Sequence, residues 1–243
     1  MGLFDAFRRK RTPASPRPHR VADTGKPITK FPQLRDAWVA IGTEMYEQAL
    51  RLAGQHVEAE DRELQHEAKK IIGIIKFRQR HYTEALGIFR EIVPGSRNAS
   101  DWFSLATAAT MSGEIDLGAE AFAKALECPI EQDSVDRLPT LFMHLFYASA
   151  LRDMKEYSRA LAQIEPIKQA YQQLKITDDT FVYIREVPML PHTMRVAMDI
   201  FRGLGARFDW RSWIRGLSES IDDEGKMYLT NCIRELEAGG SQL

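Results

Sequence analysis

The sequence has little cysteine and no long hydrophobic run. Its 243 residues include two cysteines, Cys128 and Cys232, which are too few and too isolated for a disulfide framework or a metal site. No apolar stretch approaches the roughly 18 residues that a transmembrane helix needs. The first eleven residues place their basic side chains after a short apolar patch, the reverse of a secretory signal. We therefore expect a cytoplasmic protein in a reducing compartment.

The sequence also lacks the short motifs of common catalytic and cofactor sites. Gly203 and Gly205 have no third glycine and follow no strand, and neither a Gly-x-Ser-x-Gly elbow nor a His-Glu-x-x-His motif is present. The six histidines are scattered singly. Glu63-x-x-His66 has the spacing of half a di-iron site, but no second copy exists, which favours a solvated helix face. We expect no catalytic residue, no metal and no cofactor.

Charge is unevenly distributed behind a net value of −1. Residues 1–30 hold eight Lys or Arg against two Asp, so the other 213 residues carry about −7. Phosphate contacts require a basic surface. The acidic body therefore argues against nucleic acid as the ligand.

Residues 1–32 are basic and rich in proline, and we expect residues 1 to about 30 to be disordered in solution because they offer little apolar surface to bury. Leu3, Phe4 and Phe7 precede four consecutive cations, residues 8–11. Weak peripheral contact of residues 1–11 with an anionic membrane is one interpretation. An ordinary solvated basic tail is the other.

Residues 33–243 show helical periodicity and no regular strand pattern. Apolar residues recur at three or four positions from Leu34 to Ala53, which predicts one helix that stops at Gly54. Residues 176–191 predict a connecting loop or a short helix. Residues 192–238 predict C-terminal helices, capped by Asp209 and by Asp222 or Asp223.

An internal repeat organises the middle of the chain. A shift of 33 residues superimposes small side chains on small and aromatic on aromatic, in the pairs Gly73 and Ala106, Ala85 and Gly118, and Phe89 and Phe122. A third copy places Ala160 in the small position, 42 residues beyond Gly118, with the extra residues at 128–139. Antiparallel helices approach closely where a small side chain meets a bulky one, so the pattern predicts stacked helix pairs.

This pattern resembles the tetratricopeptide repeat, a helix-turn-helix unit of about 34 residues. The resemblance implies an all-α solenoid of antiparallel helix pairs, with repeats at about 64–97, 98–130 and 140–174. An N-terminal helix would precede them, and the C-terminal helices would cap the array. Residues 33–243 would then form one repeat domain behind the tail.

The resemblance also implies a concave groove lined by the first helix of each pair. Matching the three copies gives these partner-binding candidates: Lys70, Ile74, Phe77, Arg78, Phe103, Thr107, Met111, Phe142, Leu145 and Arg152. A wall of aromatic and Met side chains suits an amphipathic helix or an extended peptide. The alternative is that several of these residues are buried against the N-terminal helix.

Together these features predict a non-catalytic adaptor that binds a protein or peptide in the groove. The alternative is a regulator or immunity-type protein that neutralises an enzyme through its acidic surface. The sequence names neither the partner nor the oligomeric state.

Overall fold

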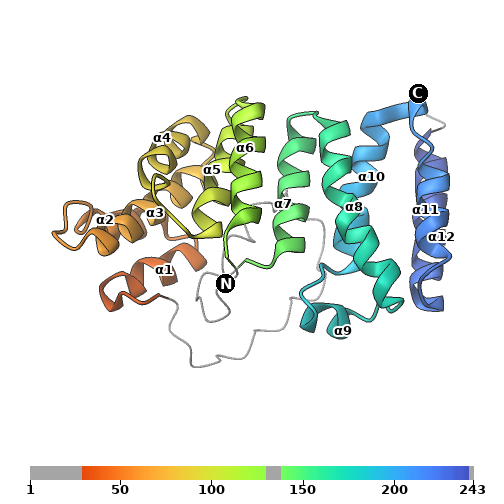
Figure 1. The fold of residues 1–243 in the computed structure, drawn as a ribbon, viewed down its shortest axis with the longest axis horizontal. Helices are drawn as coiled ribbons and strands as arrows, with labels where there is room; N and C mark the ends of the chain where they lie inside the picture. The colour runs from red at the N-terminus through yellow and green to blue at the C-terminus, as the bar shows by residue number, and fades with distance from the viewer. Residues whose placement is uncertain (1–28, 130–137, 241–243) are drawn as a thin grey trace. The chain divides into compact units, whose positions relative to one another are not determined.

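The computed structural model describes residues 29–129 and 138–240, and every regular element in these ranges is a helix (Figure 1). This confirms the all-α prediction. The chain divides into two compact units, unit 1 (1–112 with 123–137) and unit 2 (113–122 with 138–243). The predictions for the tail up to residue 28 and for the insertion at 130–137 lie outside the described residues.

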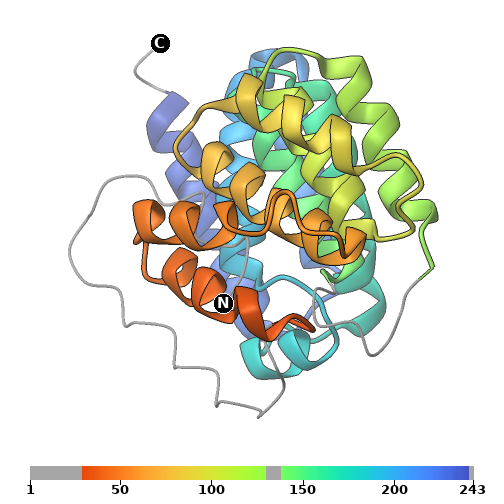
Figure 2. The same cartoon turned by 90° about the vertical axis from the view of Figure 1, so that its left-hand side faces the viewer.

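In unit 1 each helix packs against the next. The elements are η2 (Pro32–Leu34), α1 (Arg35–Gly42), α2 (Tyr46–Gly54), α3 (Arg62–Arg78), α4 (Tyr82–Ile92) and α5 (Ala99–Met111). α6 (Ile115–Glu127) crosses the boundary between the units. Figure 2 shows α1 and α2 lying side by side. The core of unit 1 includes the buried side chains of Leu34, Ile41, Ile71, Phe89 and Phe103.

The sequence explains where α3 begins and which face it buries. The Asp61 carboxylate caps the helix by accepting hydrogen bonds from the backbone N–H groups of Glu63 (2.9 Å) and Leu64 (3.2 Å). Buried side chains then recur at three or four positions along the helix, at Leu64, Ala68, Ile71 and Ile75. This spacing places them on one stripe, which packs against the neighbouring helices.

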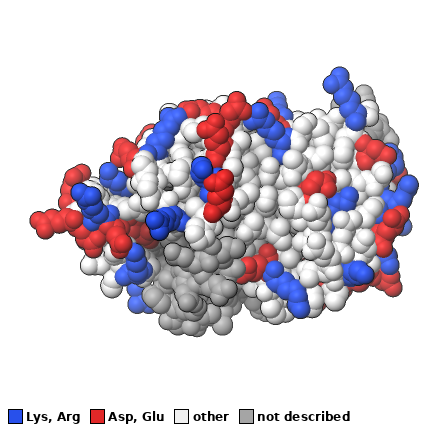
Figure 3. Space-filling model, in the orientation of Figure 1, with Lys and Arg blue, Asp and Glu red and all other residues white. Residues whose placement is uncertain are grey.

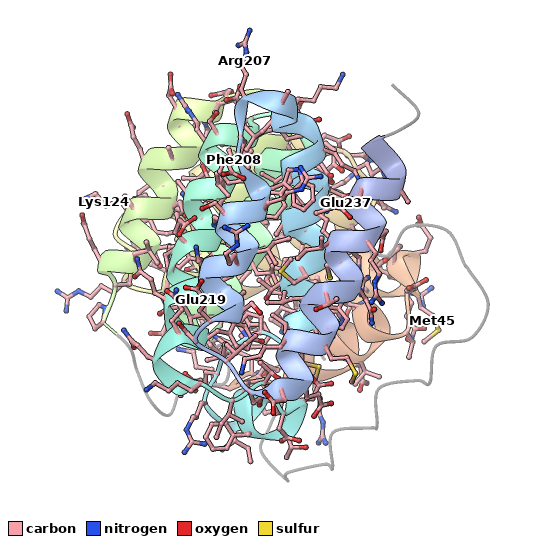
Figure 4. The ribbon with its side chains drawn as sticks, turned by 90° about the vertical axis from the view of Figure 1, so that its right-hand side faces the viewer. Met45, Lys124, Arg207, Phe208, Glu219 and Glu237 are labelled. Carbon is pink, nitrogen blue, oxygen red and sulfur yellow. The ribbon has the colours of Figure 1, made fainter. Side chains whose placement is uncertain are left out.

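Unit 2 contains the first part of α6 and the helices that follow the undescribed loop. These are α7 (Thr140–Asp153), α8 (Tyr157–Leu174), α9 (Asp179–Ile184), α10 (Leu190–Leu204), η3 (Gly205–Arg207), α11 (Trp210–Ser218) and α12 (Asp223–Gly240). α7, α8 and α10 pack on one another, and α11 and α12 run side by side (Figure 4). Asp209 and Asp222 accept backbone hydrogen bonds at the starts of α11 and α12, as predicted. α9 is the short helix expected within residues 176–191.

The predicted single helix over residues 34–53 is wrong, because α1 and α2 are separate helices that pack against each other. The break is at Thr43 to Met45, where Glu44 adopts a left-handed conformation with φ 62°. The apolar spacing continues across this turn, since both helices bury a face in the same core. Periodicity alone therefore did not reveal the turn.

The same turn recurs at four helix pairs. A residue with positive φ precedes each second helix by two positions, namely Glu44, Arg80, Gly113 and Lys155. In three of the turns the next amide donates to the carbonyl oxygen five residues back: Met45 to Ala40 (2.8 Å), His81 to Lys76 (2.9 Å) and Glu156 to Leu151 (2.8 Å). These are Schellman-type helix ends. The turns are 36, 33 and 42 residues apart, and the last two intervals match the sequence repeat.

Small residues occupy equivalent places in the second helices of these pairs. Ala49, Ala85 and Ala160 each lie five residues beyond the left-handed residue, and all three are fully buried. Gly118 has the same place in α6 and is also buried. At the α3–α4 crossing, a Cβ atom added to Gly73 would lie 2.7 Å from Phe89 Cε1. A small residue at position 73 thus allows α3 and α4 to approach closely, as the repeat pattern predicted.

Candidate partner-binding surface

The predicted groove residues of unit 1 differ in how far they reach the surface. Lys70, Ile74, Phe103 and Thr107 are buried. Phe77, Arg78 and Met111 are partly exposed. The Phe77 ring packs edge-on against Tyr82, with ring centroids 5.2 Å apart, and the Arg78 guanidinium donates to the Ile41 carbonyl oxygen at 3.0 Å. Four of these seven side chains are therefore buried inside the unit, and Phe77 and Arg78 also contact other residues of it.

Lys70 belongs to a polar cluster between α3 and the start of α5. Its Nζ lies 3.2 Å from Asp101 Oδ1, and both side chains are 2% exposed. The other carboxylate oxygen, Oδ2, lies 2.8 Å from His66 Nε2 and accepts a hydrogen bond from the Ser96 hydroxyl at 2.7 Å. Both oxygens of Asp101 thus face a polar or cationic partner.

The environment of Asp101 stabilises its charged form. Burial acts to raise the pKa of this carboxyl, but the His66 hydrogen bond, the Lys70 charge and the Ser96 hydrogen bond outweigh it and lower the pKa to about 2. Ser96 and His66 share one acceptor oxygen, so the cluster lacks the relay in which a histidine contacts a serine nucleophile. Its geometry is that of a polar contact that joins α3 to α5.

Sequence reasoning missed this cluster. The Glu63-x-x-His66 spacing was interpreted as a solvated helix face, whereas His66 is partly buried and contacts Asp101, 35 residues away. Asp101 directly precedes Trp102, which is in a repeat position. An acidic residue at this place in the sequence does not indicate that it pairs with the buried Lys70. The pairing depends on how α3 and α5 pack, which the sequence pattern does not encode.

In unit 2 the predicted residues lie on α7. Leu145 is buried, and its carbonyl oxygen accepts a hydrogen bond at 3.0 Å from the hydroxyl of Ser149 in the same helix. Phe142 and Arg152 are partly exposed. The Arg152 guanidinium contacts Asp153 at 2.9 Å and Asp199 at 3.2 Å, which links α7 to α10. The accessible part of this face is thus aromatic at Phe142 and cationic at Arg152.

Large hydrophobic side chains are exposed outside the predicted groove. In unit 1, Val39 on α1 is 44% exposed, and Met45 in the turn between α1 and α2 is 47% exposed; Figure 4 labels Met45. In unit 2, Tyr183 and Ile184 are adjacent on α9 and are 53% and 71% exposed. Sequence analysis did not select these positions, because periodicity alone does not show which face a neighbouring helix leaves uncovered.

Acidic side chains gather on the end of unit 1 that carries α2 (Figure 3). Residues 31–66 contain three Lys or Arg against seven Asp or Glu, a net charge of −4. Five exposed carboxylates in this range form no ion pair with another described residue, and we call them the acidic face: Asp36, Glu44, Glu47, Glu58 and Glu60.

Within residues 29–129 and 138–240, no group of three or more His, Cys, Asp or Glu side chains is arranged to hold a metal ion. No helix in the same ranges combines the length and the apolar character needed to cross a bilayer.

Comparison with known proteins gave no match to a family model, to a curated protein or to a solved structure. The fold itself defines the class: an all-helical protein whose successive helices pack in antiparallel pairs.

Proposed function

We propose that the protein is a tetratricopeptide-like scaffold, a non-catalytic adaptor. It binds a partner protein or peptide on the first-helix faces, by which we mean the surfaces that carry the predicted groove residues on α3, α5 and α7. The observation that carries this proposal is the turn shared by four helix pairs, at Glu44, Arg80, Gly113 and Lys155. A pair that repeats in this way cannot bury both faces alone, so such pairs stack and form extended binding surfaces. The α1–α2 pair adds a copy that the sequence repeat did not include.

The accessible part of the first-helix faces supports a peptide-like ligand. Phe77 and Met111 in unit 1 and Phe142 in unit 2 are partly exposed, and aromatic and Met side chains provide adaptable apolar contacts. Arg78 adds a cationic group on α3 of unit 1, and Arg152 adds one on α7 of unit 2. Among the buried candidates, Phe103 would support the surface of unit 1 and Leu145 that of unit 2.

The test uses the full chain as bait in an extract of its source cells. Phe77→Ala and Met111→Ala remove partly exposed side chains from the proposed surface. Val39→Ala is the matched control, because Val39 is also exposed in unit 1 but lies on α1 and is not one of the predicted groove residues. Phe103→Ala is unsuitable, since a cavity at this buried ring would cost about 3–5 kcal/mol of folding free energy.

We expect a partner that binds the parent and the Val39 variant but binds the Phe77 and Met111 variants at least tenfold more weakly. Partner binding that survives both substitutions would place the site elsewhere. A parent chain that captures no partner would contradict the scaffold proposal itself.

A second candidate function, that of a regulator or immunity-type protein that neutralises a basic enzyme, is favoured by the acidic face. Salt separates the two proposals. Contacts through apolar side chains change little between about 0.1 M and about 1 M NaCl, whereas attraction between exposed charges weakens as the Debye length falls from about 10 Å to about 3 Å. Steep salt dependence, combined with loss of binding in Glu44→Gln with Glu47→Gln, would select the acidic face.

A further inference from the structure

α9 presents the most exposed large hydrophobic side chain in the described part of the chain. Ile184 is 71% exposed, its neighbour Tyr183 is 53% exposed, and Ile176, just before the helix, is 37% exposed. Single exposed apolar residues are common, whereas exposed apolar side chains that adjoin one another and are flanked by polar residues can form a contact surface. We call Tyr183 and Ile184 the α9 face.

Specific contacts hold this helix in place. Val182 is fully buried beneath the α9 face, and the Asp178 carboxylate caps the helix by accepting from the Phe181 N–H at 2.8 Å. The Val187 amide donates to the Val182 carbonyl oxygen at 2.9 Å, and Glu186 has φ 60°, which closes the C-terminal turn. The Tyr171 hydroxyl donates to the Pro188 carbonyl oxygen beyond that turn.

The segment that leads into α9 is fixed to α12. Thr177 donates to the Asp222 carboxylate through its backbone N–H at 2.7 Å and its hydroxyl at 2.6 Å. Gly225 lies so close to this contact that an added Cβ would be 2.7 Å from Thr177 Cγ2. The exposure of the α9 face is therefore built into the packing of unit 2 and does not come from a frayed end.

The segment that contains α9 and the segment that the Thr177–Asp222 contact joins to it are mainly acidic. Residues 175–186 and 222–226, which the Thr177–Asp222 contact joins, contain three Lys or Arg against six Asp or Glu, a net charge of −3. Asp179 and Glu224 are exposed and form no ion pair with another described residue. The Arg185 guanidinium lies 3.6 Å from the centre of the Phe181 ring, so this cation packs along the helix.

We propose that the α9 face binds a basic peptide segment of a partner protein, with an aliphatic or aromatic side chain seated on Tyr183 and Ile184. The apolar pair provides the anchor, and the acidic side chains of residues 175–186 and 222–226, which we call the acidic rim, select flanking Lys or Arg. A second copy of this face carries the same net charge, so self-association would bring like charges together. An anionic membrane would be repelled for the same reason.

This inference adds a second binding surface to the proposed scaffold. It rests on the proposed function in one respect, since it also requires a protein partner. The two can fail separately. Loss of binding through Phe77→Ala with no effect of α9 substitutions would leave the scaffold standing and remove the α9 site.

The test is a selection of peptides from a random library on the immobilised full chain. Peptides that also bind the variant Tyr183→Ser with Ile184→Ser are removed. The matched control is Val39→Ser with Met45→Ser, which removes two exposed apolar side chains from unit 1. All four positions are exposed, so both variants should keep the parent's unfolding midpoint.

We expect the enriched peptides to combine Lys or Arg with an aliphatic or aromatic residue. Their dissociation constants should rise at least tenfold in the Tyr183 and Ile184 variant and stay within twofold in the control. They should also rise at least fivefold between about 0.1 M and about 1 M NaCl, because the rim charges become screened. Light scattering should detect no concentration-dependent dimer of the parent that forms through Tyr183 and Ile184.

Three results would overturn the proposal. Enriched peptides that are acidic or neutral would exclude the stated partner chemistry. No enrichment over the α9 variant would show that the face is not a peptide site. A dimer of the parent that the α9 variant abolishes would make a second copy of the chain the occupant.

Discussion

Lys70 and Asp101 form an ion pair inside unit 1, with Nζ 3.2 Å from Oδ1 and each side chain 2% exposed. The pair joins α3 to the first turn of α5 across 31 positions of sequence. Removing two charges from water costs several kcal/mol per ion, and mutual attraction with hydrogen bonds must offset that cost. The net stability that the pair adds is therefore small compared with the cost of removing only one of its partners.

Breaking this pair from one side should be strongly destabilising. Asp101→Asn keeps the shape of the side chain but leaves the Lys70 charge buried without its carboxylate, and we expect a loss of about 3–5 kcal/mol in the free energy of unfolding. The double variant Lys70→Met with Asp101→Asn removes both charges and should recover at least half of that loss. Urea unfolding of the parent, the single variants Asp101→Asn and Lys70→Met, and the double variant measures both effects. A double variant as unstable as the summed single variants would contradict the coupling.

The same carboxylate should make stability depend on acid. The folded-state pKa of Asp101 is lowered to about 2 from 3.8, so its contribution is complete above the unfolded pKa and is lost as the pH falls through the folded pKa. The difference corresponds to about 2 kcal/mol. As the pH falls from about 5 to about 2, the free energy of unfolding of the parent, relative to that of the double variant, should decrease by this amount. A gap that is constant over this range would show that Asp101 titrates normally.

Two glycines of the α3–α4 pair should respond oppositely to alanine. Gly73→Ala places a Cβ 2.7 Å from Phe89 Cε1 and 2.9 Å from Cζ, and we expect a loss of about 1–3 kcal/mol from overpacking. Gly87→Ala meets no atom within 4 Å and should stabilise α4 by about 0.5–1 kcal/mol through helix propensity. Thermal unfolding of both variants checks this, and a Gly73→Ala melt matching the parent would mean that the crossing is looser than described.

The repeated turn makes a prediction at Lys155, which has φ 64°. A left-handed conformation costs a residue with a Cβ about 1–2 kcal/mol, whereas glycine adopts it freely but loses more chain entropy on folding. Lys155→Gly should therefore raise the free energy of unfolding by about 0.5 kcal/mol. Lys155→Val should lower it by about 1 kcal/mol, because branching at Cβ is least compatible with this conformation. Equal stability of the two variants would be inconsistent with a left-handed residue there.

The sequence by itself determined the local features of this protein. Helical periodicity predicted an all-helical body, and the match of Gly73, Ala85 and Phe89 with residues 33 positions later predicted the close crossing of α3 and α4. Asp209 and Asp222 were identifiable as caps because a short acceptor side chain at a helix start satisfies backbone N–H groups only a few residues away. These features involve neighbours along the chain, or one repeat away, and a single sequence records them.

Only the tertiary structure decided which predicted groove residues are buried and which side chains remain exposed. Lys70 and Phe103 have the spacing of groove residues, yet both are buried, because a residue's exposure depends on helices distant in sequence. The break at Glu44 was hidden for a related reason, since α1 and α2 bury the same apolar stripe on either side of a turn. Periodicity reveals that a helix has a buried face, whereas the packing of its neighbours determines what the other faces contact.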